Sequence, residues 1–180
     1  VSLIKHASDD VKKDILTKVV QDGLRLCFAI EESNHHDPVK TSCEAKKDGS
    51  SFIISGEKSF VIDGGFADKV IVACRTSGKE GSKDGLSLFV LDADSKGLTI
   101  TPTKMVDSRN AANMKFENVK VSSDMLIGKE DDAFEIIESV LDISRAAIAA
   151  EMLGSAIQAY EITLDYLKER EQFGSKIGSF

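Results

Sequence analysis

Two hydrophobic periods divide the chain. From residue 131 to residue 173, apolar residues recur every three or four positions with no proline and one glycine, which predicts a long helix with one apolar face. Acidic residues at its start and basic residues near its end follow the order that the helix dipole favours. So long an apolar face needs more helices to cover it, from further chain or another subunit. The face comprises Phe134, Ile137, Leu141, Ile148, Met152, Ser155, Ala159 and Ile162.

Between residues 24 and 128 the hydrophobic period is two. Short apolar or alternating runs are separated by Asp-Gly, Ser-Gly and Lys-Gly turn sequences, and a short helix at 7–21, stopped by Gly23, precedes them. No intervening segment is long enough for crossover helices. We therefore predict an α+β fold: an antiparallel β-barrel or sandwich flanked by helices, with the start of a C-terminal helical bundle. The predicted strands are 24–31, 42–47, 52–54, 58–62, 69–75, 86–91, 98–101, 113–116 and 119–121.

Composition and charge narrow the class of partner. The net charge is −7, with both signs interspersed, which argues against nucleic acid and anionic membranes and leaves a small molecule or a protein. No apolar run reaches the ~18 residues that a membrane span needs. The three cysteines are widely spaced, so we expect buried thiols in a reducing compartment rather than disulfides or zinc ligands. They are Cys27, Cys43 and Cys74.

The ends of the sequence suggest an excerpt. It begins at Val1 without a methionine and with no visible targeting segment, and it stops just after a predicted helix. We therefore expect it to be part of a longer protein. The polar, glycine-rich segment 76–85 is predicted to be the tip of a hairpin rather than a binding loop.

Few clusters of titratable residues suggest chemistry by themselves. Residues 31–38, EESNHHDP, contain carboxylates and histidines, but adjacent residues of an extended segment point in different directions, so a solvated loop is favoured over a metal site. Asp142 and Arg145 lie three apart on one face of the long helix. They form either an intrahelical ion pair or a charged pair lining a cavity, and the pattern favours neither.

A cation, an amide and an aromatic residue lie together near the predicted end of the long helix. Arg170 and Gln172 are followed by Phe173 and Gly174. These side chains would either grip a phosphate and stack on a ring, or cap the helix.

Four stretches resemble the flavin-dependent acyl-CoA dehydrogenases. They are SGEKSFVIDGGFADKVIVACRT from Ser55, KFENVKV followed by LIGKE, LDISR ending at Arg145, and KEREQFGSKIGSF from Lys168. They follow the family's order over nearly the whole chain. The resemblance implies that residues 1–23 end an N-terminal helical domain, that 24–128 form the middle β-barrel domain, and that 129–180 begin a C-terminal helical-bundle domain.

The resemblance also implies the chemistry. Members of the family remove a proton from the α carbon of an acyl-CoA and pass the β hydride to FAD, which requires a carboxylate base. It further implies an electron-transferring flavoprotein as acceptor, a homodimer or homotetramer, no nucleic acid and no membrane insertion, in the bacterial cytoplasm or mitochondrial matrix. Asp142 and Arg145 match the substrate-binding residues. Ser144 stands where some members carry the base, so the catalytic base is not assigned.

The implied cofactor-binding residues form two groups. Three back the flavin ring, and three hold the pyrophosphate and adenine side of FAD across a subunit contact. They are Phe60, Val61 and Ile62, and Arg170, Gln172 and Phe173, respectively.

Two departures keep other functions open. Glu31 replaces a threonine or serine that the family usually has, and Ile62 replaces a residue whose hydroxyl bonds the flavin. The alternative is a flavin-deficient structural or regulatory homologue that pairs with an active acyl-CoA dehydrogenase subunit. A third possibility is an oxidase or monooxygenase of the same fold.

Overall fold

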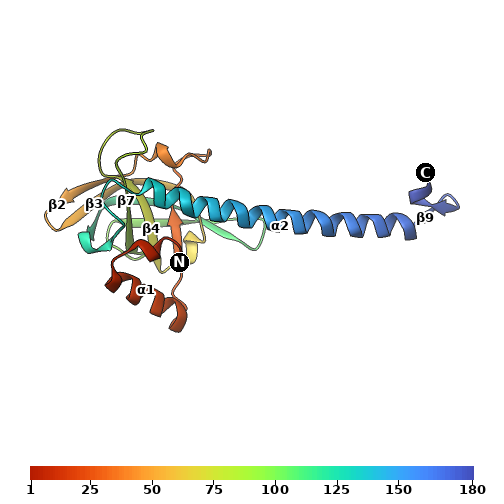
Figure 1. The fold of residues 1–180 in the computed structure, drawn as a ribbon, viewed down its shortest axis with the longest axis horizontal. Coiled ribbons are helices and arrows are strands. Elements are labelled where there is room, and N and C mark those ends of the chain that lie inside the picture. The colour runs from red at the N-terminus through yellow and green to blue at the C-terminus, as the bar shows by residue number, and fades with distance from the viewer. The chain divides into compact units, whose positions relative to one another are not determined.

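The computed structural model describes residues 1–180 as two compact units, Val1–Glu138 and Ser139–Phe180. The first unit holds a short helix and the sheet; the helix α2 begins in the first unit and continues into the second, which ends in a small hairpin. The elements are α1 (Asp9–Gln21), β1 (Leu26–Ala29), β2 (Glu44–Asp48), β3 (Ser51–Ile62), β4 (Lys69–Arg75), β5 (Leu86–Asp92), β6 (Leu98–Lys104), β7 (Asn110–Ser122), β8 (Leu126–Ile127), α2 (Phe134–Glu169), β9 (Glu171–Gln172) and β10 (Ser175–Lys176) (Figure 1).

The sheet is open. Its strand order is β6-β7-β3-β2-β4-β5-β8, and β1 pairs with β4 outside this path. The α+β class is confirmed, but the closed antiparallel barrel is not seen, since the edge strands β6 and β8 do not pair with each other. Nor is the sheet wholly antiparallel, because β1 runs parallel to β4. The connection from β1 to β4, which contains β2 and β3, is long enough for β4 to run in the same direction as β1.

Strand β3 is one strand where the sequence predicted two. It pairs with β7 throughout, and register shifts at Ile54/Gly56 and at Lys58/Val61 absorb the irregularities. Gly56 has φ +145°, and a Cβ there would lie 2.7 Å from the Cα of Cys43, so only glycine fits. Strand β7 likewise merges two predicted strands.

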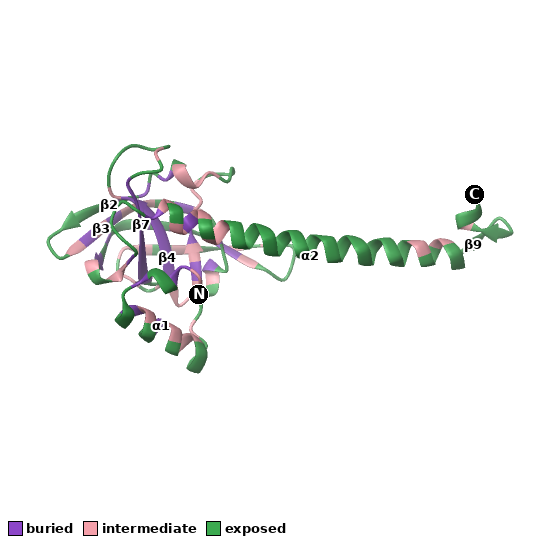
Figure 2. Cartoon of the chain, in the orientation of Figure 1, coloured by how far each residue is buried: buried purple, intermediate pink, exposed green.

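The core is built on the sheet, where β4 and β5 are almost wholly buried, whereas β2 and β6 are mostly exposed or half-buried (Figure 2). The rings of Phe52 and Phe89 lie 4.8 Å apart at its centre. The three cysteines are buried and free, as predicted. Burial raises the pKa of Cys27 to about 12, which keeps this thiol protonated and unreactive.

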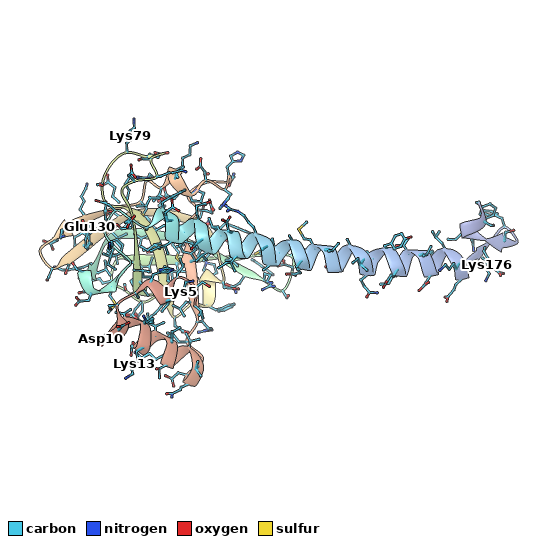
Figure 3. All side chains as sticks on the ribbon, viewed as in Figure 1. Lys5, Asp10, Lys13, Lys79, Glu130 and Lys176 are labelled. Carbon is cyan, nitrogen blue, oxygen red and sulfur yellow. The ribbon has the colours of Figure 1, made fainter.

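Helix α1 confirms the predicted short helix. It begins two residues later than predicted, and Gly23, with φ +69°, follows its end. Val11 and Ile15 are buried, and the helix lies beside the sheet (Figure 1). The labelled side chains of Asp10 and Lys13 point outward (Figure 3). Neither α1 nor α2 is both long and apolar enough to cross a membrane.

Helix α2 ends four residues before the predicted position. The chain turns at Phe173 and Gly174, which have φ values of +51° and +79°, and this turn joins β9 to β10 as an antiparallel hairpin. The apolar side chains of α2 surround the helix instead of lining one face, and most are exposed (Figure 2). The large ones are Ile143, Ile148, Met152, Leu153, Ile157, Tyr160, Ile162 and Tyr166.

Candidate functional site

The bulge near the end of β3 creates an apolar wall in the first unit. Phe60 and Ile62 are 50% and 48% exposed, while Val61 between them is buried. Phe60 has φ +49°, and its N–H donates to the Oδ1 of Asn113 at 3.0 Å. We call the segment Phe60–Ile62 the β3 wall. It leaves two apolar side chains half exposed on the surface of the first unit.

The segment after β1 lies against the start of this wall. The N–H of Ser59 donates to the Glu31 carbonyl at 2.8 Å. The Glu31 carboxylate hydrogen-bonds the Nδ1 of His36 and accepts from the N–H of Asp37 at 3.4 Å. Residues 31–37 form no helix or strand, as expected for a loop, and no group of three acidic, histidine or cysteine side chains is placed to hold a metal ion.

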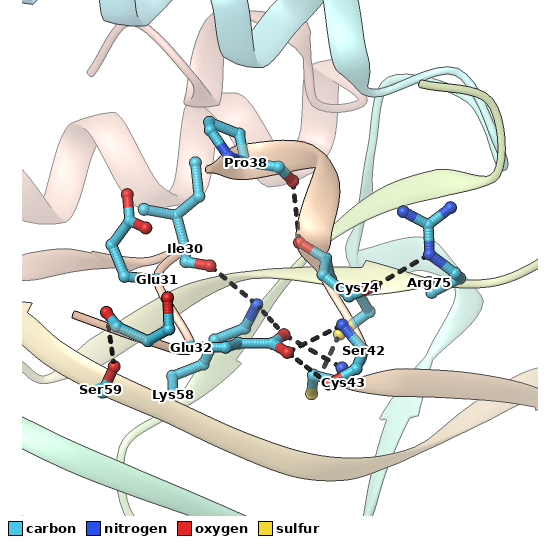
Figure 4. Close-up of polar contacts among 12 residues, drawn as sticks. Ile30, Glu31, Glu32, Pro38, Ser42, Cys43, Lys58, Ser59, Cys74 and Arg75 are labelled. Atoms are coloured by element: carbon cyan, nitrogen blue, oxygen red, sulfur yellow. Dashed lines mark hydrogen bonds and ion pairs between the residues drawn. The ribbon is translucent and has the colours of Figure 1, made fainter. Parts of the chain in front are cut away.

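A buried ion pair, which the sequence analysis missed, lies beside the wall. The side chain of Lys58 is 0% exposed, and its Nζ donates to the Ile30 carbonyl at 3.0 Å and to Glu32 Oε1 at 2.7 Å (Figure 4). The Glu32 carboxylate also accepts from the N–H groups of Ser42 and Cys43, at 2.8 and 3.0 Å, and from the Ser42 hydroxyl at 2.5 Å.

The electrostatics of Glu32 follow from these partners. Burial by itself would raise the pKa of Glu32, but the Lys58 ammonium and the hydrogen bonds from Lys58, Ser42 and Cys43 outweigh burial and lower the pKa. The carboxylate is therefore ionised at neutral pH. The strand pattern held a signal for this pair, since Lys58 has the same parity along β3 as the buried Phe52 and Ile54.

Arg75, at the end of β4, ties two loops together. Its buried guanidinium donates to four backbone carbonyls and to no carboxylate, and burial lowers the pKa of Arg75. The predicted hairpin tip 76–85 does connect the antiparallel strands β4 and β5. Arg75 fixes it to the chain before β2. The four acceptors are the carbonyls of Val39, Thr41, Ser82 and Asp84.

Asp142 and Arg145 lie on α2, in the second unit. Arg145 Nη1 donates to Asp142 Oδ1 at 2.6 Å, and both side chains are exposed. The intrahelical ion pair is thus present. A role in substrate binding stays a prediction. Ser144 donates its hydroxyl hydrogen to the Val140 carbonyl at 2.9 Å, as a serine within a helix commonly does.

The hairpin after α2 carries the second group of predicted cofactor residues. Phe173 is almost fully exposed at the turn, and Gln172 Nε2 donates to the Glu171 carbonyl at 2.7 Å. The side chain that caps the helix is Lys176, whose Nζ donates to the Glu169 carbonyl at 3.2 Å. The exposed Arg170 and Phe173 side chains are therefore available to a ligand or a second chain.

Comparisons with known proteins place these features in a family. The profile described as acyl-CoA dehydrogenase, middle domain, matches residues 27–119, and the one described as acyl-CoA dehydrogenase, C-terminal domain, matches residues 132–180. The probable acyl-CoA dehydrogenase YngJ of Bacillus subtilis is 33% identical over 182 residues, which cover 99% of this chain and 48% of YngJ. The chain spans about half the length of the curated relatives it matches.

Solved structures share the fold of this chain. An acyl-CoA dehydrogenase from Geobacillus kaustophilus superposes with a TM-score of 0.90 at 28% identity, covering 99% of this chain and 48% of that one. A structure described as the electron transferring flavoprotein of Acidaminococcus fermentans superposes with a TM-score of 0.85 at 29% identity and the same coverage.

Proposed function

This chain belongs to the acyl-CoA dehydrogenase family, and on that premise we propose that the whole protein is an FAD-dependent oxidoreductase that forms an α,β double bond in an acyl-CoA thioester. The β3 wall is the observation that carries the proposal. A flavin ring is flat and presents apolar faces, which half-exposed side chains such as Phe60 and Ile62 fit. When bound, FAD supplies the acceptor for the substrate hydride.

The residues beside the wall also fit a flavin. A free carboxylate near an electron-rich ring would oppose negative charge on it. Here the Glu31 carboxylate is not free, because it is hydrogen-bonded to the Nδ1 of His36 and to the N–H of Asp37. This pairing supports flavin binding despite the glutamate at that position.

The second unit would supply contacts to substrate and to the distal part of FAD. The exposed Asp142–Arg145 pair suits the polar groups of an acyl-CoA. Arg170, Gln172 and Phe173 would hold the pyrophosphate and adenine side of FAD in a neighbouring subunit. The exposed apolar side chains around α2 support a homodimer or homotetramer, because a helix that is apolar all round is normally covered by others.

Further features of the whole protein follow from the family. We propose an electron-transferring flavoprotein as its electron acceptor and the bacterial cytoplasm or mitochondrial matrix as its location. We propose no residue of this chain as the catalytic base.

Anaerobic titration of the full-length protein tests the function. The purified protein should show oxidised-flavin absorbance, which acyl-CoA thioesters from short to long chains should bleach in the absence of oxygen. A flavin that no thioester reduces would refute the proposal. Rapid reoxidation by oxygen would favour an oxidase of the same fold.

A second candidate rests on Ile62. The β3 wall contains no side-chain hydroxyl, so a hydrogen bond that the family usually makes to the flavin is missing. A colourless protein that takes up no added FAD would support a flavin-deficient subunit that pairs with an active one. Mixing it with an active family subunit should then raise that subunit's activity, and no change would exclude this role.

A further inference from the structure

Lys58 is the most deeply buried charged residue of the first unit. It is a fully buried lysine in the middle of a strand, paired with a carboxylate that is only 14% exposed. Burying such a pair costs desolvation, and apolar residues of similar volume often stabilise a fold equally well. Stability is therefore an insufficient reason for its presence.

The pair pins the end of β1 to β3 directly before the bulge. Lys58 Nζ binds the Ile30 carbonyl and the Glu32 carboxylate, and the neighbouring Ser59 N–H binds the Glu31 carbonyl. Three consecutive residues after β1 are thus bonded to two consecutive residues of β3. The next residue, Phe60, takes the left-handed conformation that turns the strand.

The same carboxylate reaches a third segment. Through the N–H groups of Ser42 and Cys43, Glu32 closes the loop that leaves β1 and returns as β2 (Figure 4). The Cα of Cys43 in turn lies against Gly56 of β3. One ion pair therefore ties β1, β2 and β3 together beside the wall.

We propose that the Lys58–Glu32 ion pair is the positioning device of the β3 wall: it fixes the bulge so that Phe60 and Ile62 face the ligand while Val61 enters the core. This inference rests on the proposed function in one respect, namely that the wall's ligand is the flavin. Lys58 touches no ligand in this scheme and acts through Ser59 and the backbone of Phe60.

Charge-removing variants of the full-length protein test the inference. The set is Lys58→Met, Glu32→Gln and the double variant, with Lys69→Met as a matched control. Lys69 is also a largely buried, ion-paired lysine of the sheet, bonded to Asp92. The measurements are amide hydrogen exchange without FAD, the Kd for FAD, the flavin absorbance spectrum and the Tm.

The inference predicts a local effect. Lys58→Met should speed exchange of the Ser59 and Phe60 amides about tenfold or more relative to those of β4, and weaken FAD binding by about tenfold or more. The double variant should recover the Tm, because no unpaired charge stays buried, but not the FAD affinity or the wild-type flavin spectrum. Lys69→Met should leave exchange and FAD binding unchanged.

Three results would overturn it. They are exchange at Ser59 and Phe60 that stays at the wild-type rate, exchange that rises equally across β4, and a double variant that recovers FAD binding together with the Tm. The hydrogen-exchange measurement needs no flavin. If the wild-type protein binds no FAD, the proposed function is refuted, but the exchange rates of Ser59 and Phe60 still test the positioning role. If Lys58→Met fails to fold, Glu32→Gln takes its place in the same measurements, because glutamine keeps the shape of the glutamate side chain.

Discussion

Phe60 is expected to give an inverted ranking of alanine and glycine variants. The left-handed conformation of Phe60, φ +49°, costs a residue with a Cβ about 1–2 kcal/mol. Alanine keeps this cost and glycine removes it, whereas glycine loses about 0.5–1 kcal/mol through the entropy of the unfolded chain. Both variants lose the same ring. Phe60→Gly should therefore be more stable than Phe60→Ala by about 0.5–1 kcal/mol, the reverse of the usual order.

The same two variants also measure how much the Phe60 ring contributes to FAD binding. A phenylalanine side chain has roughly 200 Å² of surface, of which the half-exposed Phe60 offers about 100 Å² to a ligand. At about 25 cal/mol per Å², covering that area contributes up to about 2.5 kcal/mol, which corresponds to a change in Kd on the order of 50-fold. Both variants should weaken FAD binding by about this factor.

Thermal unfolding and FAD titration of the full-length protein check both expectations. The Tm of Phe60→Gly should exceed that of Phe60→Ala by about 2 °C. Glu57, exposed on the same strand and without a positive φ, provides the control: Glu57→Ala should be more stable than Glu57→Gly, with FAD binding unchanged. Backbone strain at Phe60 is excluded if Phe60→Ala is more stable than Phe60→Gly. If both Phe60 variants bind FAD with wild-type affinity, the β3 wall does not contact the flavin.

Three other predictions follow from the site. Ile62→Thr should increase the fraction of FAD retained through purification, because it restores a hydroxyl to the wall, and no gain in flavin absorbance per protein would contradict this. Arg145→Ala should weaken acyl-CoA binding in calorimetric titration, whereas an unchanged Kd would exclude a substrate role. Because the folded-state pKa of Glu32 is lowered, its ionised form stabilises the protein above the unfolded pKa of about 4.3, and this contribution is lost as the pH falls through the folded-state value. The Tm advantage of wild type over Glu32→Gln should thus be full near pH 7 and shrink below about pH 4; a pH-independent difference would refute it.

Local patterns predicted the elements well where one period continues without interruption. Helix α1 and strand β4 were expected within two residues of their observed bounds, because alternation and capping act over a few neighbouring residues. Strand β3 was divided because Gly56 interrupts the alternation, although pairing with β7 carries the strand through. The parallel pairing of β1 with β4 depends on contacts distant in sequence, which local periodicity does not encode.

The site was only partly predictable. Phe60–Ile62 were singled out only by their resemblance to a family motif. Nothing in the hydrophobic alternation of these residues indicates that the strand bulges. Lys58 was missed because lysine usually lies on the surface, although its position along the strand is an inward one. The Phe173-Gly174 turn carried a recognisable glycine signal, but the helical spacing before it favoured a longer helix.

The bulge in β3 divides a single strand into two segments that bury residues of opposite parity. Before it, even-numbered residues such as Phe52 and Ile54 face the interior; after it, the odd-numbered Val61 does, and the even-numbered Phe60 and Ile62 are left outside. A saturation mutagenesis profile along this strand should therefore switch phase near residue 59. From Lys58 to Val61, β3 takes three steps where β7 takes two, so a one-residue deletion there would remove the bulge and leave a regular strand with Val61 still inside and Phe60 and Ile62 still outside.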